Sequence, residues 1–492
     1  MASTDRLPRR SRRGPAVDGD RHPVDELMRP GPLFVYGLQH VMSMYAGVIA
    51  VPLIVGGALK LSVADQAYLI SAAVLVSGLA TLLQTLGIWK IGARLPLVQG
   101  TSFAAVPSML AIGTSAHGGF NGLVTIFGSV VIAGVVGFLI TPLFNRLIHY
   151  FPPVVTGTVI TVIGVSLLPV AINWAAGGTK GVNPGWGSMS NIALAALTLL
   201  AIVLIYKFLP GFFSRIAILL GLVVGTLIAW PMGKIDFSAV GTASWFSITS
   251  PFHFGAPVFN ISAIISMIIV ILVVMTETTA DILAVGEVVG RPADGPTVAA
   301  GLRADTLSTA VSGGLLNSFS ASAFAQNVGL VAITGIKSRF VVATGGIILV
   351  VLGIIPKIGA VVVSIPLPVL GGVGLALFGT VAASGIKALS RVEYEGNNNL
   401  IIVAVSIGIG IIPIAVSDFY SAFPLWFQTI FDSGISAAAL VAVLLNILFN
   451  VVGRRGAEPA LIAESPTPGV TPDHDVPGGL SASEPTRPLA EH

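Results

Sequence analysis

The chain has 492 residues, of which 54% are hydrophobic and only 10% are charged, with a formal net charge of +3. Soluble domains carry roughly 25% charged residues, so this composition excludes a protein that faces water on every side. Cysteine is absent, which excludes disulfides and thiolate metal sites. Apolar runs of about 20 residues recur along the chain, and that length crosses a hydrocarbon core of roughly 30 Å. The sequence therefore predicts an integral membrane protein with many spans.

In chain order, a polar, Arg- and Pro-containing stretch at residues 1–30 predicts a disordered cytoplasmic arm. A membrane domain is expected at residues 31–455, and residues 456–492, rich in Pro, Glu, Ser and Gly, predict a disordered cytoplasmic tail. About fourteen hydrophobic segments make up the domain. They are expected at 33–56, 66–88, 99–113, 122–143, 151–170, 191–208, 214–231, 259–284, 295–313, 326–335, 339–355, 358–384, 398–416 and 434–452.

Basic residues in the connections predict the orientation. With the N-terminus in the cytoplasm, eleven Lys and Arg residues fall in the expected cytoplasmic loops and four in the external loops. Lys and Arg accumulate in the cytoplasmic loops of membrane proteins. We therefore expect a multi-pass protein of the cell membrane with both termini in the cytoplasm.

Segments three and ten, 99–113 and 326–335, are too short or too polar to cross as helices. Each follows a β-like stretch, Leu95–Val98 in one case and Ser320–Ala325 in the other. Each is the third of seven segments in its half, and an odd number of spans places the halves in opposite orientations. Paired broken segments in inverted repeats indicate a transporter's binding site near the membrane midplane. The predicted fold is all-α, with two inverted seven-segment repeats and short β-strands before the broken segments.

Ionisable groups inside the spans are few. Burying one at bilayer depth costs at least about 2.5–3.5 kcal/mol, so each is a functional candidate. Glu277 and Asp281 are four residues apart and share one helix face. Repulsion and desolvation favour keeping a proton on at least one of them, as a proton-coupled carrier requires. The alternative is a buried carboxylic acid that is hydrogen-bonded to a neighbouring helix.

Gln326 and Asn327 begin the tenth segment. A carboxamide presents a donor and an acceptor, which matches the adjacent N–H and C=O groups of a planar lactam such as a purine dione. A helix that starts here would also direct its free N–H groups and positive dipole end at the cavity. For Asn327 the alternative is an N-cap of that helix.

Other polar and aromatic candidates allow two interpretations each. Phe103, in the run Gln99–Phe103 that opens the third segment, offers a ring face to a planar ligand or packs in the core. His40 in the first segment is a proton relay or a buried neutral imidazole. Asp305 takes part in transport, or it pairs with Arg303 near the cytoplasmic rim.

These residues resemble the nucleobase–ascorbate transporters, also called nucleobase–cation symporter family 2. The run Gln326–Gly335 is similar to the family signature (Q/E/P)-N-x-G-x-x-x-x-T-(R/K/G), with every specified position filled. Gln39-His40 resembles the Q-H motif of the first helix, and Gln99–Phe103 resembles the third-segment stretch. The resemblance covers roughly 30–452.

The resemblance implies fourteen spans in a core domain and a gate domain, usually in a homodimer. The core would hold segments 1–4 and 8–11, about 31–145 and 257–357, and the gate segments 5–7 and 12–14, about 146–256 and 358–455. It implies a proton-coupled symporter that imports xanthine or uric acid by alternating access. No enzymatic activity, metal, cofactor other than the proton, or nucleic-acid partner is expected; the partners are a nucleobase, protons and membrane lipid.

The resemblance also implies roles for single residues. Glutamine at 326 is similar to the xanthine and urate members, whereas glutamate is typical of uracil members, and aspartate at 281 leans the same way. The implied substrate-binding residues are Ser102, Phe103, Glu277, Ala325, Gln326 and Asn327. The implied proton-coupling residues are His40, Glu277, Asp281 and Asp305.

Four alternatives to purine import stay open. A uracil symporter of the same family differs chiefly at Gln326. An anion transporter of the same architecture would place cationic or dipolar groups at the broken helices, which Glu277 argues against because a carboxylate repels an anion. A membrane enzyme that uses the Glu277–Asp281 pair lacks a metal-ligand spacing such as H-E-x-x-H, and a channel needs no base-reading amide.

Overall fold

The structure is a computed structural model that describes residues 22–147, 150–183, 185–395 and 397–452, with the backbone alone at 145–147. All described residues belong to one compact unit. Residues 1–21 of the predicted arm and the whole predicted tail, 456–492, lie outside the described residues.

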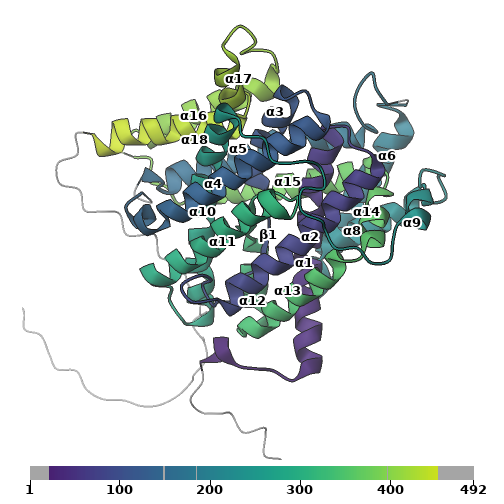
Figure 1. The fold of residues 1–492 in the computed structure, drawn as a ribbon, viewed down its shortest axis with the longest axis horizontal. Coiled ribbons are helices and arrows are strands. Elements are labelled where there is room, and N and C mark those ends of the chain that lie inside the picture. The colour runs from purple at the N-terminus through teal and green to yellow at the C-terminus, as the bar shows by residue number, and fades with distance from the viewer. Residues whose placement is uncertain (1–21, 148–149, 184, 396, 453–492) are drawn as a thin grey trace, which may run out of the picture. The chain divides into compact units, whose positions relative to one another are not determined.

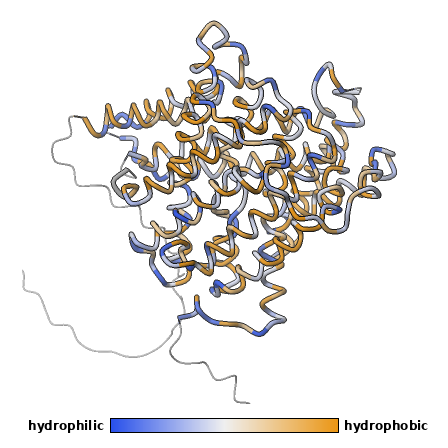
Figure 2. Tube along the Cα trace, viewed as in Figure 1, coloured by the Kyte–Doolittle hydropathy of each residue, from blue (hydrophilic) through white to orange (hydrophobic). Residues whose placement is uncertain are grey.

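The described chain is almost entirely helical (Figure 1). Hydrophobic residues cover the helices, and hydrophilic residues gather at their ends and in the connections (Figure 2). Within this part of the chain, eight helices are long and apolar enough to cross a membrane, and α13 with α14, bent by 79° at a short break, would add a ninth. The chain is therefore a multi-pass membrane protein.

The first half of the fold comprises η1 (Pro23–Asp25), α1 (Pro30–Ala58), α2 (Val63–Leu86), β1 (Gln99–Thr101), η2 (Phe103–Ala105), α3 (Val106–Ser115), α4 (Gly119–Leu147), α5 (Pro153–Ala175), α6 (Met189–Phe208), α7 (Phe212–Arg215), α8 (Ala217–Ala229) and α9 (Ser238–Thr242). The second half comprises α10 (Ile261–Val289), α11 (Gly295–Leu315), β2 (Ala321–Ala323), α12 (Ala325–Thr334), α13 (Arg339–Gly353), α14 (Pro356–Val363), α15 (Leu367–Leu389), α16 (Asn399–Ala415), α17 (Leu425–Phe431), α18 (Gly434–Asn446) and η4 (Ile447–Val451).

Two short strands join the halves of the chain. β1 and β2 pair antiparallel, with Gln99 opposite Ala323 and Thr101 opposite Ala321. Each strand is buried and leads directly into a short helix, α3 through η2 in one case and α12 in the other. The expected strands before the broken segments are therefore present, but the first lies later than predicted: Leu95–Val98 precedes β1 rather than forming it.

Two other predictions about the elements are wrong. The segment expected at 358–384 is divided between α14 and α15, because the chain breaks before Pro366 and the residue before a proline is disfavoured in a helix. Disorder was expected throughout 1–30, but residues 22–30 are ordered, with Val24 fully buried and α1 starting at Pro30.

Candidate functional site

The outer edges of the two-stranded ribbon are held by threonine hydroxyls from neighbouring helices. On β1, the Gln99 N–H donates to Thr81 Oγ1 on α2 at 3.0 Å. On β2, the Ala321 N–H donates to Thr309 Oγ1 on α11 at 3.0 Å and the Ala323 N–H to Thr278 Oγ1 on α10 at 3.3 Å. Buried backbone groups need such partners, so the strands stay in place without a larger sheet.

A group of three carboxyl side chains lies beside β2. Glu277 and Asp281 occupy one face of α10, and Asp305 lies on α11, close enough for the three to interact electrostatically. The Thr278 hydroxyl donates to the Asp305 carboxylate. In the described part of the chain, no Lys or Arg forms an ion pair with any of the three. The cluster therefore holds its negative charge, or its protons, without a basic neighbour.

Asp305 does not pair with Arg303, so that alternative is wrong. The Arg303 guanidinium donates to the Lys90 carbonyl at 3.2 Å instead, while Asp305 is fully buried. Residues two positions apart on a helix do not face each other, which separates the two side chains.

Several buried polar atoms near the carboxyl cluster have no hydrogen-bond partner. They include one oxygen each of Asp281 and Asp305 and both amide atoms of Gln99. The Gln99 amide lies next to Asp305 without reaching hydrogen-bond geometry. Buried polar atoms usually have a hydrogen-bond partner in native proteins, so these atoms retain the capacity to bond to a ligand.

The first turn of α12 has one accessible face and one buried face. Ala325 and Gln326 are exposed, whereas Asn327 is fully buried. Asn327 Nδ2 contacts His40 Nδ1 at 2.9 Å and the His40 carbonyl at 3.3 Å, across to α1. The residue that precedes α12 is Phe324, and no side chain caps this helix. The N-cap interpretation of Asn327 is therefore wrong.

The Asn327 contact constrains the tautomer of His40. An amide nitrogen only donates, so with the amide in this orientation His40 Nδ1 accepts and the ring proton lies on Nε2. This favours a buried neutral imidazole over a charged one in this conformation.

Replacing Asn327 by alanine is expected to destabilise the protein by about 1–3 kcal/mol, because it leaves the buried His40 Nδ1 without its partner and removes a second hydrogen bond, to the His40 carbonyl. Thermal unfolding of the purified protein in detergent measures this. Asn121→Ala, at an exposed position on α4, is the matched control and should leave the transition unchanged. Equal transitions for the two variants would contradict the structural role of Asn327.

Phe103 lies between the two broken segments and α15. Its ring centroid is 6.4 Å from that of Phe324 and 5.9 Å from that of Phe378 on α15, in an edge-on arrangement with the latter. The Phe324 ring in turn covers Gly100 so closely that a Cβ there would lie 2.4 Å from it. Phe103 is half-buried, so it packs in the core and retains an accessible part. The neighbouring Ser102 is buried, and its hydroxyl has no partner.

Among the described residues, no group of three or more His, Asp or Glu side chains is placed to hold a metal ion. A cavity of about 450 Å³ opens elsewhere, between the start of α2, the 239–249 stretch and α14. None of the predicted site residues lines it.

Residues 31–419 of the chain match the model of the permease family. The chain belongs to this family, the nucleobase–ascorbate transporters. It is 45% identical to the uric acid transporter UacT of Escherichia coli over 441 residues, which cover 89% of this chain and 90% of the relative. It is 43% identical to the xanthine permease of Bacillus subtilis over 418 residues, 85% of this chain and 94% of the relative. This permease is therefore a transporter and not an enzyme.

Solved structures of other transporters share the fold of the permease. The transmembrane domain of the cyanobacterial bicarbonate transporter BicA aligns with a TM-score of 0.55 at 16% identity and covers 83% of this chain and 97% of that one. Murine Slc26a9, an anion transporter in the inward-facing state, aligns with a TM-score of 0.58 at 13% identity and covers 86% of this chain and 69% of that one. At such low identity the likeness concerns the fold alone.

Thr278, Thr81 and Thr309 of the permease were not predicted as site residues from the sequence. Hydroxyls of Ser and Thr within spans commonly bond to their own helix, as Thr279 does to the Met275 carbonyl. A threonine inside a span therefore does not by itself indicate a contact with another segment. Gln99 was predicted as a polar candidate inside the third segment, but its position beside Asp305 was not.

Proposed function

We propose that this permease imports an oxopurine, uric acid or xanthine, across the cell membrane by proton-coupled alternating access. The observation that carries the proposal is the identity of 40–45% over most of the chain to relatives named for uric acid and xanthine. No anion transporter among the fold neighbours named above exceeds 16% identity. Sequence likeness therefore favours the purine, although the architecture is shared.

The substrate would bind between the first turn of α12 and the carboxyl face of α10, which pack against each other. Gln326 and Glu277 would read the hydrogen-bonding edge of the base, since an amide and a carboxyl group together match adjacent donors and acceptors. Phe103 would face the ring plane, and Ser102, Ala325 and Asn327 would complete the pocket. The accessibility of Ala325 and Gln326 and the unpaired Ser102 hydroxyl support this assignment.

Coupling to protons would use the carboxyl cluster and His40. A cluster of Glu277, Asp281 and Asp305 without a basic partner in the described chain is suited to hold and release a proton. Protonation of His40 at Nδ1 would require Asn327 to turn its amide oxygen toward the ring. In the present contact the amide nitrogen faces Nδ1, and two N–H donors cannot bond to each other. Asn327 lies next to Gln326, so the proton and the base would share one turn of α12.

We propose fourteen spans in two inverted repeats. Helix contacts support this. When two segments of the chain pack against each other, the segments seven places further on, counted cyclically, also pack against each other. α2 packs against α13 as α11 packs against α4, α1 against α13 as α10 against α4, and α6 against α8 as α16 against α18. The hydrogen bonds that hold the strands follow the same rule. β1 is bonded to segment one, where Thr101 Oγ1 donates to the Val48 carbonyl, and to segment two through Thr81, and β2 is bonded to segments eight and nine through Thr278 and Thr309.

The core would comprise α1–α4 and α10–α14, and the gate α5–α8 and α15–α18. The boundary between core and gate would lie at the break before α15 rather than at residue 358, because α14 and α13 form one bent segment. Four buried serines lie where α3 and α10 meet α18: Ser108 Oγ is 2.7 Å from Ser433 Oγ and 2.9 Å from Ser436 Oγ, which is 3.2 Å from Ser266 Oγ. Movement of the core against the gate would exchange these hydrogen bonds.

We further propose that both termini are cytoplasmic, that lipid surrounds the spans and that the protein forms a homodimer. The N-terminal arm at Asp25, the end of the second segment at Thr85 and two expected cytoplasmic connections, at Arg291 and Arg339, meet at one place, which supports a common side for them. Dimer formation rests on the family alone.

Uptake of radiolabelled xanthine in cells that lack their own purine carriers tests the proposal. We expect saturable uptake that unlabelled uric acid inhibits and that sulfate and bicarbonate leave unchanged. Inhibition by uracil but not uric acid would favour the uracil alternative, and inhibition by bicarbonate or sulfate would overturn the proposal.

A further inference from the structure

The residues just before α1 form a short ordered segment, His22–Glu26, built around the turn η1. Its apolar residue, Val24, is fully buried in a cluster that includes Val285 and Val289 of α10 and Val331 of α12. Burying a valine side chain contributes roughly 1.5–3 kcal/mol, which stabilises the position of this segment against α10 and α12. The segment is therefore a fitted part of the fold.

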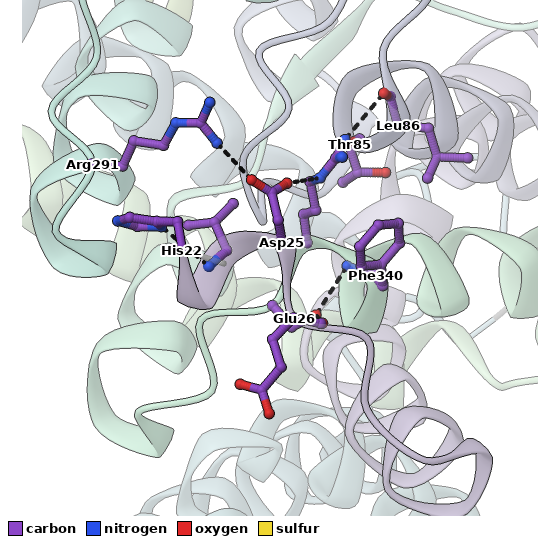
Figure 3. A network of polar contacts seen from close by, with 10 residues as sticks. His22, Asp25, Glu26, Thr85, Leu86, Arg291 and Phe340 are labelled. Carbon is purple, nitrogen blue, oxygen red and sulfur yellow. Dashed lines mark hydrogen bonds and ion pairs between the residues drawn. The ribbon is translucent and has the colours of Figure 1, made fainter. Parts of the chain in front are cut away.

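Asp25 joins two arginines from distant parts of the chain, and Figure 3 shows it beside Arg291. Its Oδ2 lies 3.1 Å from Arg291 Nη1 and its Oδ1 lies 2.7 Å from Arg339 Nε. Both of the Lys or Arg salt bridges found in the described part of the chain belong to this one carboxylate. Asp25 therefore lies between two like charges and attracts both.

The same place holds the ends of three helices. Arg339 Nη1 donates to the carbonyls of Thr85 at 3.0 Å and Leu86 at 3.1 Å, at the C-terminal end of α2. The Ser338 hydroxyl donates to the Glu26 carbonyl at 2.6 Å, and a His22 ring nitrogen lies 3.3 Å from the Gly290 carbonyl. Main chain and side chains of His22–Glu26 thus bind the end of α10 and the start of α13 together.

These two ends belong to the elements that carry the site. Arg291 follows the last turn of α10, the helix of Glu277 and Asp281. Arg339 begins α13, four residues after Gly335 ends the helix of Gln326 and Asn327. Short connections transmit the position of one helix end to the next, so the Asp25 contacts constrain the spacing between α10 and α12.

We propose that His22–Glu26 is a latch and that Asp25 is a positioning residue that holds α10 and α12 at the spacing substrate binding requires. The transport readout of this proposal rests on the proposed function; the structural readout does not. Removing the carboxylate leaves Arg291 and Arg339 facing each other, and their repulsion separates the two ends.

Xanthine uptake by Asp25→Asn, Asp25→Glu and Glu26→Gln, normalised to the transporter in the membrane, tests the latch. Glu26 is the matched control, because its side chain is exposed and makes no ion pair with a described residue. For Asp25→Asn we expect a KM about five-fold above wild type, near-normal KM for Asp25→Glu, and no change for Glu26→Gln. The double variant Asp25→Asn/Arg291→Gln removes the repulsion and should recover much of the loss.

An unchanged KM for Asp25→Asn would overturn the latch. A lower amount of protein in the membrane as the only defect of Asp25→Asn, with no recovery in the double variant, would also overturn it. If Asp25→Asn does not accumulate in the membrane, the KM values of Arg291→Gln and Asp25→Glu are compared instead. Hydrogen exchange of purified protein gives a readout independent of substrate: amides in the last turns of α2 and α10 should exchange faster in Asp25→Asn than in Glu26→Gln. Equal exchange also contradicts the proposal, whereas absence of xanthine uptake by wild type contradicts only the proposed function.

Discussion

Glu277→Gln is expected to lower uptake of xanthine and uric acid by about 100-fold, since a hydrogen bond to a charged group contributes up to about 3 kcal/mol. Glutamine keeps the shape of the side chain but can neither carry the charge nor release a proton. Glu277 is half-buried, four residues before Asp281 on α10, and no described Lys or Arg pairs with it. Initial uptake rates, normalised to the transporter in the membrane, measure the effect.

Glu287→Gln is the matched control for that variant. Glu287 lies on the same helix, ten residues further on, and its side chain is exposed. It should transport at the wild-type rate, because its charge is solvated and distant from the carboxyl cluster. Comparable uptake by the two variants would contradict the role assigned to Glu277.

Gln326→Glu is expected to reduce xanthine and uric acid uptake at least ten-fold, on the order of the loss of one hydrogen-bond donor against a base edge. The carboxylate offers acceptors only, whereas the carboxamide offers both kinds of group. Glutamate at this place resembles the uracil members of the family, so uracil should become the better competitor. Competition of xanthine uptake by uric acid and uracil measures the change.

Gln326→Met separates the loss of the amide from the gain of a charge. Methionine has a similar shape but no strong hydrogen-bonding group, so it should lose purine uptake without gaining uracil uptake. Both variants should remain folded, because Gln326 is exposed on the first turn of α12. Xanthine transport at the wild-type level in Gln326→Glu would remove Gln326 from the proposed pocket.

Much of the architecture could be predicted from hydropathy, because a span must be both long and apolar. The broken segments were also visible, as short or polar runs in equivalent places. The position of β1 was not: Gln99–Thr101 contains a glutamine and a glycine, which indicate a loop or a helix start, and its strand conformation depends on pairing with β2. Register of this kind is a tertiary property that no local run of residues contains.

The break between α14 and α15 was predictable but missed. Hydropathy continues through residues 358–384, yet Pro366 and Pro368 mark the place where a helix must stop and another can begin. In the site, helical spacing placed Glu277 and Asp281 together, because four residues make about one turn. Asp305 could not be placed beside them, since α11 meets α10 only through the folding of the chain.

The ordered segment before α1 carried no signal in the sequence. Val24 and Asp25 lie in a short polar stretch with prolines and arginines, which is typical of a disordered arm. Their role depends on Arg291 and Arg339, more than 260 residues away. Single-sequence patterns do not reveal pairs at that separation.

Uptake of uric acid into proteoliposomes that contain only this protein tests the central claim most directly. With an inwardly directed pH gradient, acid outside, we expect uric acid to accumulate above its external concentration and the accumulation to disappear when a protonophore collapses the gradient. The internal pH should fall as protons enter together with the substrate. Equilibration without accumulation, at a rate independent of the gradient, would contradict a proton-coupled purine carrier.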